Sequence, residues 1–506
     1  MNTTSRREFL GGVGRSVGCA AVGLALAERL GFAEALSVLA RERLRFGALD
    51  PLVDLLQETP ADALMPLVVQ RLRAGTPLAD VVGAAALANA RAYGGINYNG
   101  YHTLMAMMPS FEMAAQMPAP YGALPVLKVL HRNARFLQET GCARKDALEP
   151  LEGAAHPADL VESVRAREVT EAEQSLAALE GRSRGQAYEA IQTVVRDDMN
   201  VHRVVLAWRA YDLLRLTGEG QSTTMLRQSI RFCIEEDGRR AGRGESANGI
   251  VTLLPKLMQE HCLEGRERGD RAADDAWIEH LSDMLFSGDR AAAAGAAAAA
   301  LSEGFDPECV GAAMSLAATR LLLNDPGLTQ EAQGKPIGSV HGASIGVHAS
   351  DSANAWRHIA RTGSARNAFA SLIAGAYHTA GQSGRIGAQP NDHDAEPCTK
   401  EDPAELLREI DGRIRARDQK GACQAARRYC ELDHSRADLF ALLLGFAVSE
   451  DGALHSEKYF RTAQDEHSTA RAAHRDLYLV ALTRVSASQF GFPAPGCDEA
   501  RKLLAS

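Results

Sequence analysis

The sequence predicts an all-α protein, a multi-helix array of antiparallel helical hairpins, and three observations support this. Apolar residues make up 46% of the 506 residues but aromatic residues only 5%, and long β-branched runs are scarce, a composition that favours helices. Apolar side chains recur at helical spacing, as at Leu64, Leu67, Val68 and Leu72. Helix-start and helix-stop residues separate such stretches at short intervals. The length calls for about two or three packing units.

The N-terminal segment resembles a twin-arginine export signal. The run Ser5-Arg6-Arg7-Glu8-Phe9-Leu10 precedes an apolar stretch of small residues at 16–27 and the cleavage pattern Ala33-Glu34-Ala35. We therefore expect residues 1–35 to be a signal peptide, the twin-arginine translocase to be a partner, and the mature protein to be periplasmic or otherwise exported. This pathway moves folded proteins, many of which take up a cofactor in the cytoplasm.

The mature chain shows helix punctuation from its beginning. Thr59 is expected to cap a helix with Pro60 in its first position and Asp62 at the positive end of its dipole, and Gly75 ends that helix. Further helices are expected over residues 121–138, 159–180, 201–216, 225–236, 290–301 and 306–323. We expect residues 36–380 to form the main helical domain.

A change of composition marks the C-terminal part. Residues 381–401 are rich in Gly, Pro, Asn and Asp without an apolar period, which predicts a linker or a long surface loop. Asp402 and Glu405 then form a capping-box pattern before a helical stripe that includes Leu406 and Ile410. Residues 402–506 are expected to pack on the main domain as helical hairpins. An array of tetratricopeptide repeats stays a minor alternative, because no fixed period is found.

Charge and motifs argue against several classes of function. The formal net charge is −9, and the basic residues alternate with acidic ones, so nucleic acid is not an expected partner. No apolar run of about 20 residues follows the N-terminus, so no membrane span is expected in the mature chain. The nine cysteines are dispersed, and no obligatory disulfide is predicted. No nucleophile elbow, phosphate-binding loop, dinucleotide fingerprint or haem-attachment motif occurs.

Five residues in helical stretches are candidates for a buried metal site. His102 lies in a Met-rich apolar stretch, His202 opens the helix that contains Trp208, and His455 and Lys458 share a helical face. His348 is preferred to His341, because on one helix they would lie about 10 Å apart along the axis. Taken singly, each such histidine is more often a core residue. The pair Asp197-Asp198 before His202 is either a partner to an imidazole or, more often in such positions, a helix cap.

These stretches resemble the questin oxidase-like proteins and their uncharacterised bacterial relatives, a helical family in which several helices begin near a histidine followed by an apolar run. The resemblance implies a mononuclear non-haem iron with His102, His202, His348 and His455 as ligands and Lys458 carbamylated as an anionic ligand. It also implies oxygenase chemistry on aromatic compounds, although kinship of fold does not transfer a substrate.

Two functions from different classes follow from the sequence. The first is an exported His-ligated metalloprotein, an iron oxygenase or oxidase acting on a small-molecule substrate that the sequence does not identify. The second is a non-enzymatic exported helical scaffold or binding protein whose histidines are structural. Convergence of the four histidines on one point in space would favour the first.

Overall fold

Helices account for nearly all regular structure in the computed structural model, which describes residues 44–92, 97–140, 155–182, 185–332, 334–341 and 344–506. Over these residues there are three isolated β-bridges and no strand, which confirms the all-α prediction. The predicted signal peptide lies outside the described residues. The chain divides into a small unit, Met1–Arg45 with Arg144–Leu148, and a large unit, Phe46–Ala143 with Glu149–Ser506. Every helix below belongs to the large unit.

The first helices of the large unit form one packed group, α3 (Asp50–Glu58), α4 (Ala61–Arg73), α5 (Leu78–Ala92), α6 (Tyr98–Ala114) and α7 (Leu124–Glu139). Helix α5 packs on α3, α6 and α7 and is buried on almost every face, since small alanines let its neighbours approach closely. Two details of the prediction for α4 are wrong. Pro60, not Thr59, occupies the cap position, and Leu67 is 38% exposed, at the edge of the apolar stripe.

The next group is α8 (Pro157–Ala166), α9 (Val169–Arg182), α10 (Gln186–Val195), α11 (Val201–Asp212), α12 (Leu214–Thr217) and α13 (Ser222–Gly242). Two helices predicted as continuous are each divided here. Arg167 takes a left-handed conformation with φ 65°, which ends α8 inside the predicted 159–180 helix. The predicted 201–216 helix is divided at Leu213, between α11 and α12.

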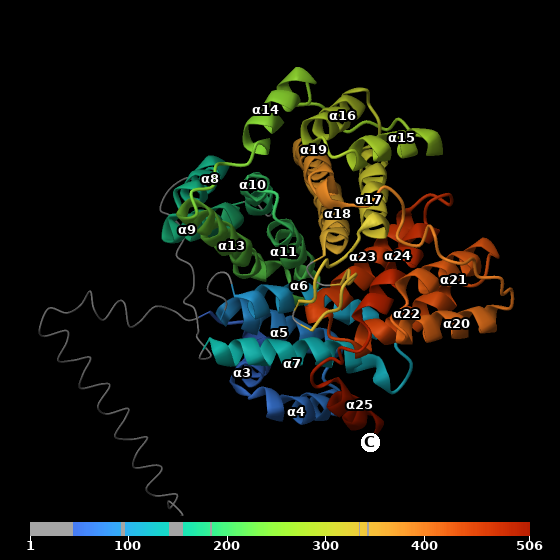
Figure 1. The fold of residues 1–506 in the computed structure, drawn as a ribbon. Helices are drawn as coiled ribbons and strands as arrows, with labels where there is room; N and C mark the ends of the chain where they lie inside the picture. Colours follow the sequence, from blue (N-terminus) through green and yellow to red (C-terminus); the bar gives the residue numbers. More distant parts are fainter. Residues whose placement is uncertain (1–43, 93–96, 141–154, 183–184, 333, 342–343) are drawn as a thin grey trace, which may run out of the picture. The chain divides into compact units, whose positions relative to one another are not determined.

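The middle of the chain contributes α14 (Ile250–Glu260), α15 (Asp275–Phe286), α16 (Arg290–Ser302), α17 (Pro307–Asn324), α18 (Ile345–Thr362) and α19 (Ala365–Ala380). The alanine run forms α16, as predicted. Helices α17 and α18 lie side by side (Figure 1) and approach so closely that a Cβ added at Gly346 would stand 2.3 Å from Cα of Leu322. Only glycine permits this approach, which fixes the start of α18 against α17.

The C-terminal helices are α20 (Pro403–Arg415), α21 (Gln419–Glu431), α22 (Arg436–Ser449), α23 (His455–Thr469), α24 (Asp476–Gln489) and α25 (Cys497–Ala505). Asp402 caps α20 by accepting from the amide of Glu405 at 2.9 Å, as the sequence predicts. The 381–401 segment contains only a short 3₁₀ turn and is tied to α21 by the Arg427–Asp392 ion pair at 2.7 Å. Helix α23 packs on α6, α18 and α24, which brings the C-terminal helices to the candidate site.

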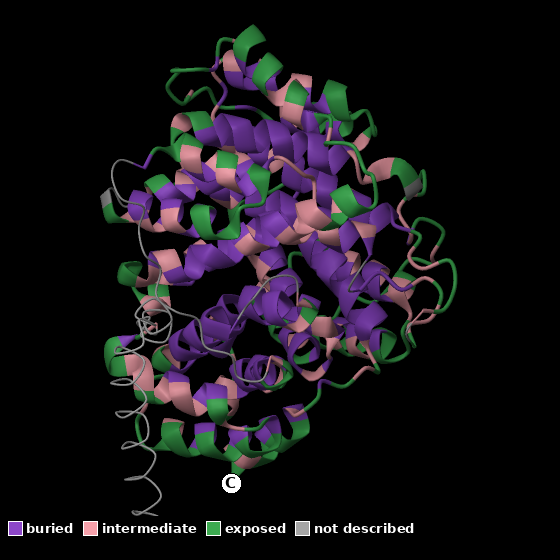
Figure 2. Cartoon of the chain, turned by 90° about the vertical axis from the view of Figure 1, so that its left-hand side faces the viewer, coloured by how far each residue is buried: buried purple, intermediate pink, exposed green. Residues whose placement is uncertain are grey.

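Burial is graded from the inner helices to the outer ones (Figure 2). Inner helices such as α19 are buried over almost their full length, whereas α20 buries only the stripe of Leu406, Ile410 and Ile414. Such an arrangement lets buried polar side chains from the inner helices meet far from solvent. Among the described helices, none combines the length and the apolar character needed to cross a membrane.

Candidate metal centre

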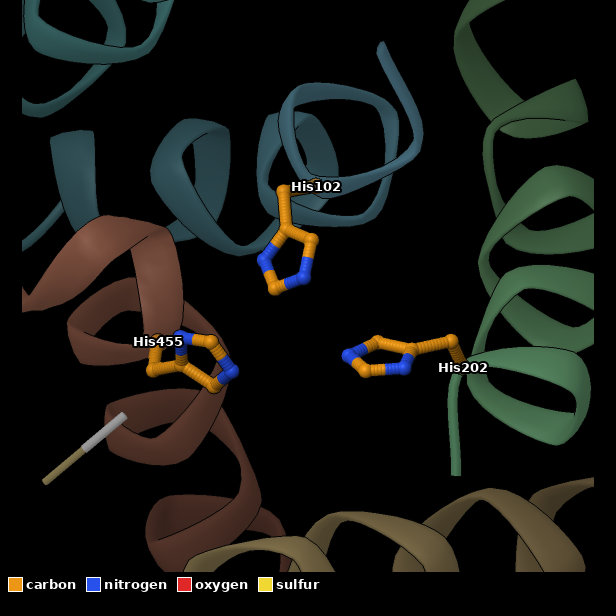
Figure 3. Close-up of side chains that lie close together, drawn as sticks. All are labelled: His102, His202 and His455. Atoms are coloured by element: carbon orange, nitrogen blue, oxygen red, sulfur yellow. The ribbon is translucent and has the colours of Figure 1, made fainter. Parts of the chain in front are cut away.

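The five predicted residues come from four helices that pack on one another. His102 lies on α6, His202 on α11, His348 on α18, and His455 and Lys458 on α23. Helix α6 packs on α11 and α23, and α18 also packs on α11 and α23, so the four helices surround a common point. Figure 3 shows the rings of His102, His202 and His455 directed toward one another from three of these helices. The structure thus brings together residues that are up to 356 positions apart in the chain.

Each ligand candidate lies near the N-terminal end of its helix. Asn200 caps α11 through the amide of His202 at 2.9 Å, and Ser344 caps α18. His102 is in the second turn of α6, and His455 is the first residue of α23. Four helix N-termini therefore meet at the site, and their partial positive charges favour a bound anion and disfavour protonated imidazole.

The distances between the imidazoles suit one metal ion. Ligand nitrogens of His102, His202 and His455 all lie within 4.8 Å of one another. His348 is the fourth imidazole of the group. The centroid of its ring lies 5.3 Å from that of His202 and 5.4 Å from that of His455. Nitrogens bound to a common ion at about 2.0–2.1 Å are at most about 4.2 Å apart, so small side-chain movements would bring the nitrogens of His102, His202 and His455 to coordination distance.

Two nitrogen pairs show which atoms face the centre. Nε2 of His348 lies 3.3 Å from Nε2 of His455, and Nζ of Lys458 lies 3.5 Å from Nδ1 of His102. Nε2 of His102 and Nε2 of His202 are buried without a hydrogen-bond partner. Buried polar atoms without a partner are uncommon, and an ion that accepts these lone pairs is one way to satisfy them.

The electrostatic environment keeps all four imidazoles neutral. Burial, then the neighbouring Lys458 charge, lower the pKa of His348 to about 3. Burial also sets the pKa of His102, His202 and His455 well below the usual value, and Lys458 and the neighbouring imidazoles lower it further. Neutral imidazole is the form that binds metal ions, so no proton has to leave these rings first.

Lys458 is poised between its charged and neutral forms. Burial lowers the pKa of Lys458 to about 8, against the opposing effect of the Asp351 charge. Asp351 lies one turn after His348, and Oγ1 of Thr462 donates to it at 2.9 Å. Burial raises the pKa of Asp351 in turn. A buried amine with so low a pKa is nucleophilic over an accessible range of pH.

The four imidazoles differ in how far they are buried. His102 is 0% exposed and His455 4% exposed, whereas His202 and His348 are half-buried and retain accessible surface. A structural metal site is normally closed by protein ligands, while a catalytic site keeps one position open.

Aromatic rings pack against two of the imidazoles. Tyr98 stacks on His102 with centroids 4.1 Å apart and an interplanar angle of 22°. Tyr101 contacts both His102, at 4.8 Å, and His202, at 5.1 Å. These contacts restrict rotation of the two rings, which keeps their nitrogens directed at the centre.

Two expectations from the sequence are wrong, one about His341 and one about Asp197 and Asp198. His341 does not share a helix with His348, because α18 begins only at Ile345; its Nδ1 instead lies 3.0 Å from Oγ of Ser488. Asp197 and Asp198 neither cap α11 nor contact an imidazole. Asp197 pairs with Arg165 at 2.8 Å and Asp198 with Arg240 at 2.8 Å, while Asn200 is the cap.

Sequence reasoning missed the residues that surround the ligands. Asp351, and the buried pair Lys128 and Glu457 at 2.6 Å, were not singled out. A signal for Asp351 is present in the sequence, because it is the only acid among residues 345–362 and lies three positions after His348. The Lys128–Glu457 pair had no local signal. Comparison of the chain with protein-family models, with curated proteins and with solved structures found no match.

Proposed function

We propose that this protein is an exported metalloprotein in which His102, His202, His348 and His455 bind one iron ion, and that it acts as an oxygenase or oxidase on a small molecule. The observation that carries the proposal is the convergence of neutral imidazoles from four helices, with ligand nitrogens of three of them within 4.8 Å of one another. Structural core histidines have no reason to gather at one point, since each needs only a hydrogen-bond partner.

The donor set fits iron. Imidazole nitrogen suits iron, as it also suits zinc, copper and nickel, and the set contains no thiolate, which would favour an iron–sulfur cluster. Bound iron would supply one-electron and dioxygen chemistry at a position that the protein ligands leave open. The protein's part is to hold four neutral donors, of which His102 and His455 are more deeply buried than His202 and His348.

Lys458 is proposed to provide the negative charge that four neutral ligands lack. Its neutral amine would attack carbon dioxide, form an N–C bond and release one proton, giving a carbamate. The low pKa of Lys458 supports this step, since the neutral amine is the reacting form. The four helix N-termini around the site stabilise the resulting anion.

Elemental analysis of the protein purified from its native export route tests the metal. We expect close to one iron per chain in the wild type and loss of it in His348→Ala and in His455→Ala, with helical circular dichroism retained. His378→Ala is the matched control, because His378 is also buried with an unpartnered Nε2, but it lies on α19 and is not one of the histidines whose nitrogens could hold an ion together. Wild-type protein without metal would refute the proposal and favour the scaffold alternative.

The export half of the proposal has its own test. Replacing Arg6 and Arg7 together by lysine is expected to leave the full-length chain in the cytoplasm, because the arginine pair is what the translocase recognises. Normal export of the double variant would contradict a twin-arginine route without affecting the metal site.

A further inference from the structure

The segment that leads into His455 has an unusual backbone. Gly452, Ala453 and Leu454 have φ values of 47°, 52° and 64°, so three consecutive residues lie in the left-handed region. Glycine enters this region freely, but alanine and leucine are strained there. Strain of this kind persists only where the surroundings over-determine it, and it concentrates at functional sites.

The left-handed turn places a carbonyl group against the His455 ring. Nδ1 of His455 lies 3.2 Å from the carbonyl oxygen of Gly452. A carbonyl oxygen can only accept, so this hydrogen bond requires the proton on Nδ1. Nε2 then carries the lone pair, and Nε2 is the atom that faces His348 at 3.3 Å. The turn therefore selects the tautomer that can bind a metal ion.

Buried contacts hold the turn from both ends. Nζ of Lys128, on α7, donates to the carbonyl oxygens of Ala447 at 2.9 Å and Glu450 at 2.5 Å, just before the turn. The same ammonium pairs with Glu457, in the first turn of α23, at 2.6 Å. Lys128 and Glu457 are 1% and 0% exposed. One buried cation thus connects the chain before the turn to the chain after it.

A second set of contacts fixes the outer side of the turn. The amide of Asp451 donates to the carbonyl of Phe492 at 2.7 Å, and the Asp451 carboxylate pairs with Arg132. Oγ of Ser456 donates to Oε1 of Gln489 at 2.8 Å. These contacts explain why alanine and leucine are kept in a conformation they disfavour.

We propose that the turn Gly452–Leu454 is a positioning element that sets the tautomer and direction of His455 before any metal binds, and that Lys128 is the residue that keeps it in place. This role of the turn rests on the proposed metal site, but the tautomer of His455 is a property of the metal-free chain and can be measured without the ion. Among the hydrogen bonds of the described residues, His455 is the only predicted ligand whose ring donates to a backbone carbonyl.

The experiment compares two substitutions of nearly equal size at Ala453, which is half-buried. Asparagine tolerates the left-handed region, whereas valine, being β-branched, does not. Metal-free protein labelled with ¹⁵N in histidine is examined by long-range ¹H–¹⁵N correlation, which shows which ring nitrogen carries the proton. The His455 signals are assigned by their absence in His455→Gln.

We expect the Nδ1–H tautomer at His455 in the wild type and in Ala453→Asn, and its loss in Ala453→Val. With Co²⁺ as the probe ion, Ala453→Val should bind about 10- to 100-fold more weakly than Ala453→Asn, the usual effect of losing a ligand's orienting partner. Lys128→Met should shift the tautomer in the same direction as Ala453→Val.

Two results would overturn the inference. One is an Nε2–H tautomer in the wild type, which needs no variant to fold. The other is identical spectra for the valine and asparagine variants. If the wild type shows the Nδ1–H tautomer but binds neither iron nor Co²⁺, the metal proposal fails while the role of the turn stands, so the two failures are distinct.

Discussion

The buried pair of Lys128 and Glu457 should be strongly coupled in stability. Each is essentially inaccessible to solvent, and their charged atoms are 2.6 Å apart. Removing one partner leaves an uncompensated buried charge, so Lys128→Met and Glu457→Leu should each lower the free energy of unfolding by about 3–5 kcal/mol. Independent effects would sum to about 6–10 kcal/mol in the double variant.

The double variant should lose far less than that sum. It has no buried charge left, and its main defect is that the carbonyls of Ala447 and Glu450 lose their common donor. An unsatisfied buried acceptor costs about 1–3 kcal/mol, so the expected loss for the two carbonyls is about 2–6 kcal/mol. Set against the sum of about 6–10 kcal/mol, the coupling between the two positions is then about 4 kcal/mol.

Urea unfolding of the metal-free full-length chain measures these values, followed by tryptophan fluorescence and circular dichroism to test for a single transition. The matched control is the exposed pair Lys256 and Glu260, one turn apart on α14 at 3.6 Å, where the equivalent variants should change stability by less than about 1 kcal/mol. Additivity of the Lys128 and Glu457 variants within about 0.5 kcal/mol would refute the reasoning.

Three further predictions concern acid stability, carbamylation and helix packing. Burial lowers the pKa of His378 to about 3, below the 6.5 of an unfolded histidine, so its contribution to stability is complete above pH 6.5 and is lost on acidification. Between pH 6.5 and 4.5 the loss is about 2.3 kcal/mol, and His378→Gln should remove that part of the slope in urea unfolding. Protein prepared with ¹³C-bicarbonate should show a carbamate carbon resonance that is absent in Lys458→Arg; no resonance in the wild type would contradict carbamylation. Gly346→Ala should lower the free energy of unfolding in urea by about 1–3 kcal/mol, because the added Cβ would overlap the backbone of Leu322. Gly295→Ala in α16, where an added Cβ has nothing within 4 Å, should raise that free energy by about 0.5–1 kcal/mol.

The parts of the fold that sequence predicts well are those governed by local rules. The cap at Asp402 and the alanine helix α16 are examples, since a side-chain cap and intrinsic propensity act within a few residues. The break at Arg167 was missed because an arginine in the left-handed region has no characteristic sequence signal. The exposure of Leu67 depends on which neighbours cover the stripe, and periodicity alone does not specify them.

The candidate ligands could be proposed from sequence only by combining two signals, a histidine within an apolar helical stretch and the family resemblance of those stretches, because such a histidine by itself is more often a core residue. Their supporting residues could not be selected in the same way. Lys128 resembles any lysine of an amphipathic helix until α7 is placed against the start of α23. The left-handed turn before His455 was likewise hidden, because only one of its three residues is glycine.

The distribution of the ligands along the chain bears on when a metal ion can be taken up. Positions 102, 202, 348 and 455 lie on four separate helices, and no two are an i, i+4 pair that could hold an ion in an unfolded segment. The site exists only after α6, α11, α18 and α23 have packed together, so ion binding must follow folding of nearly the whole chain. A twin-arginine route moves proteins after they have folded. The proposed metal centre and the proposed route of export therefore require the same order of events, in which folding and metal uptake in the cytoplasm precede translocation.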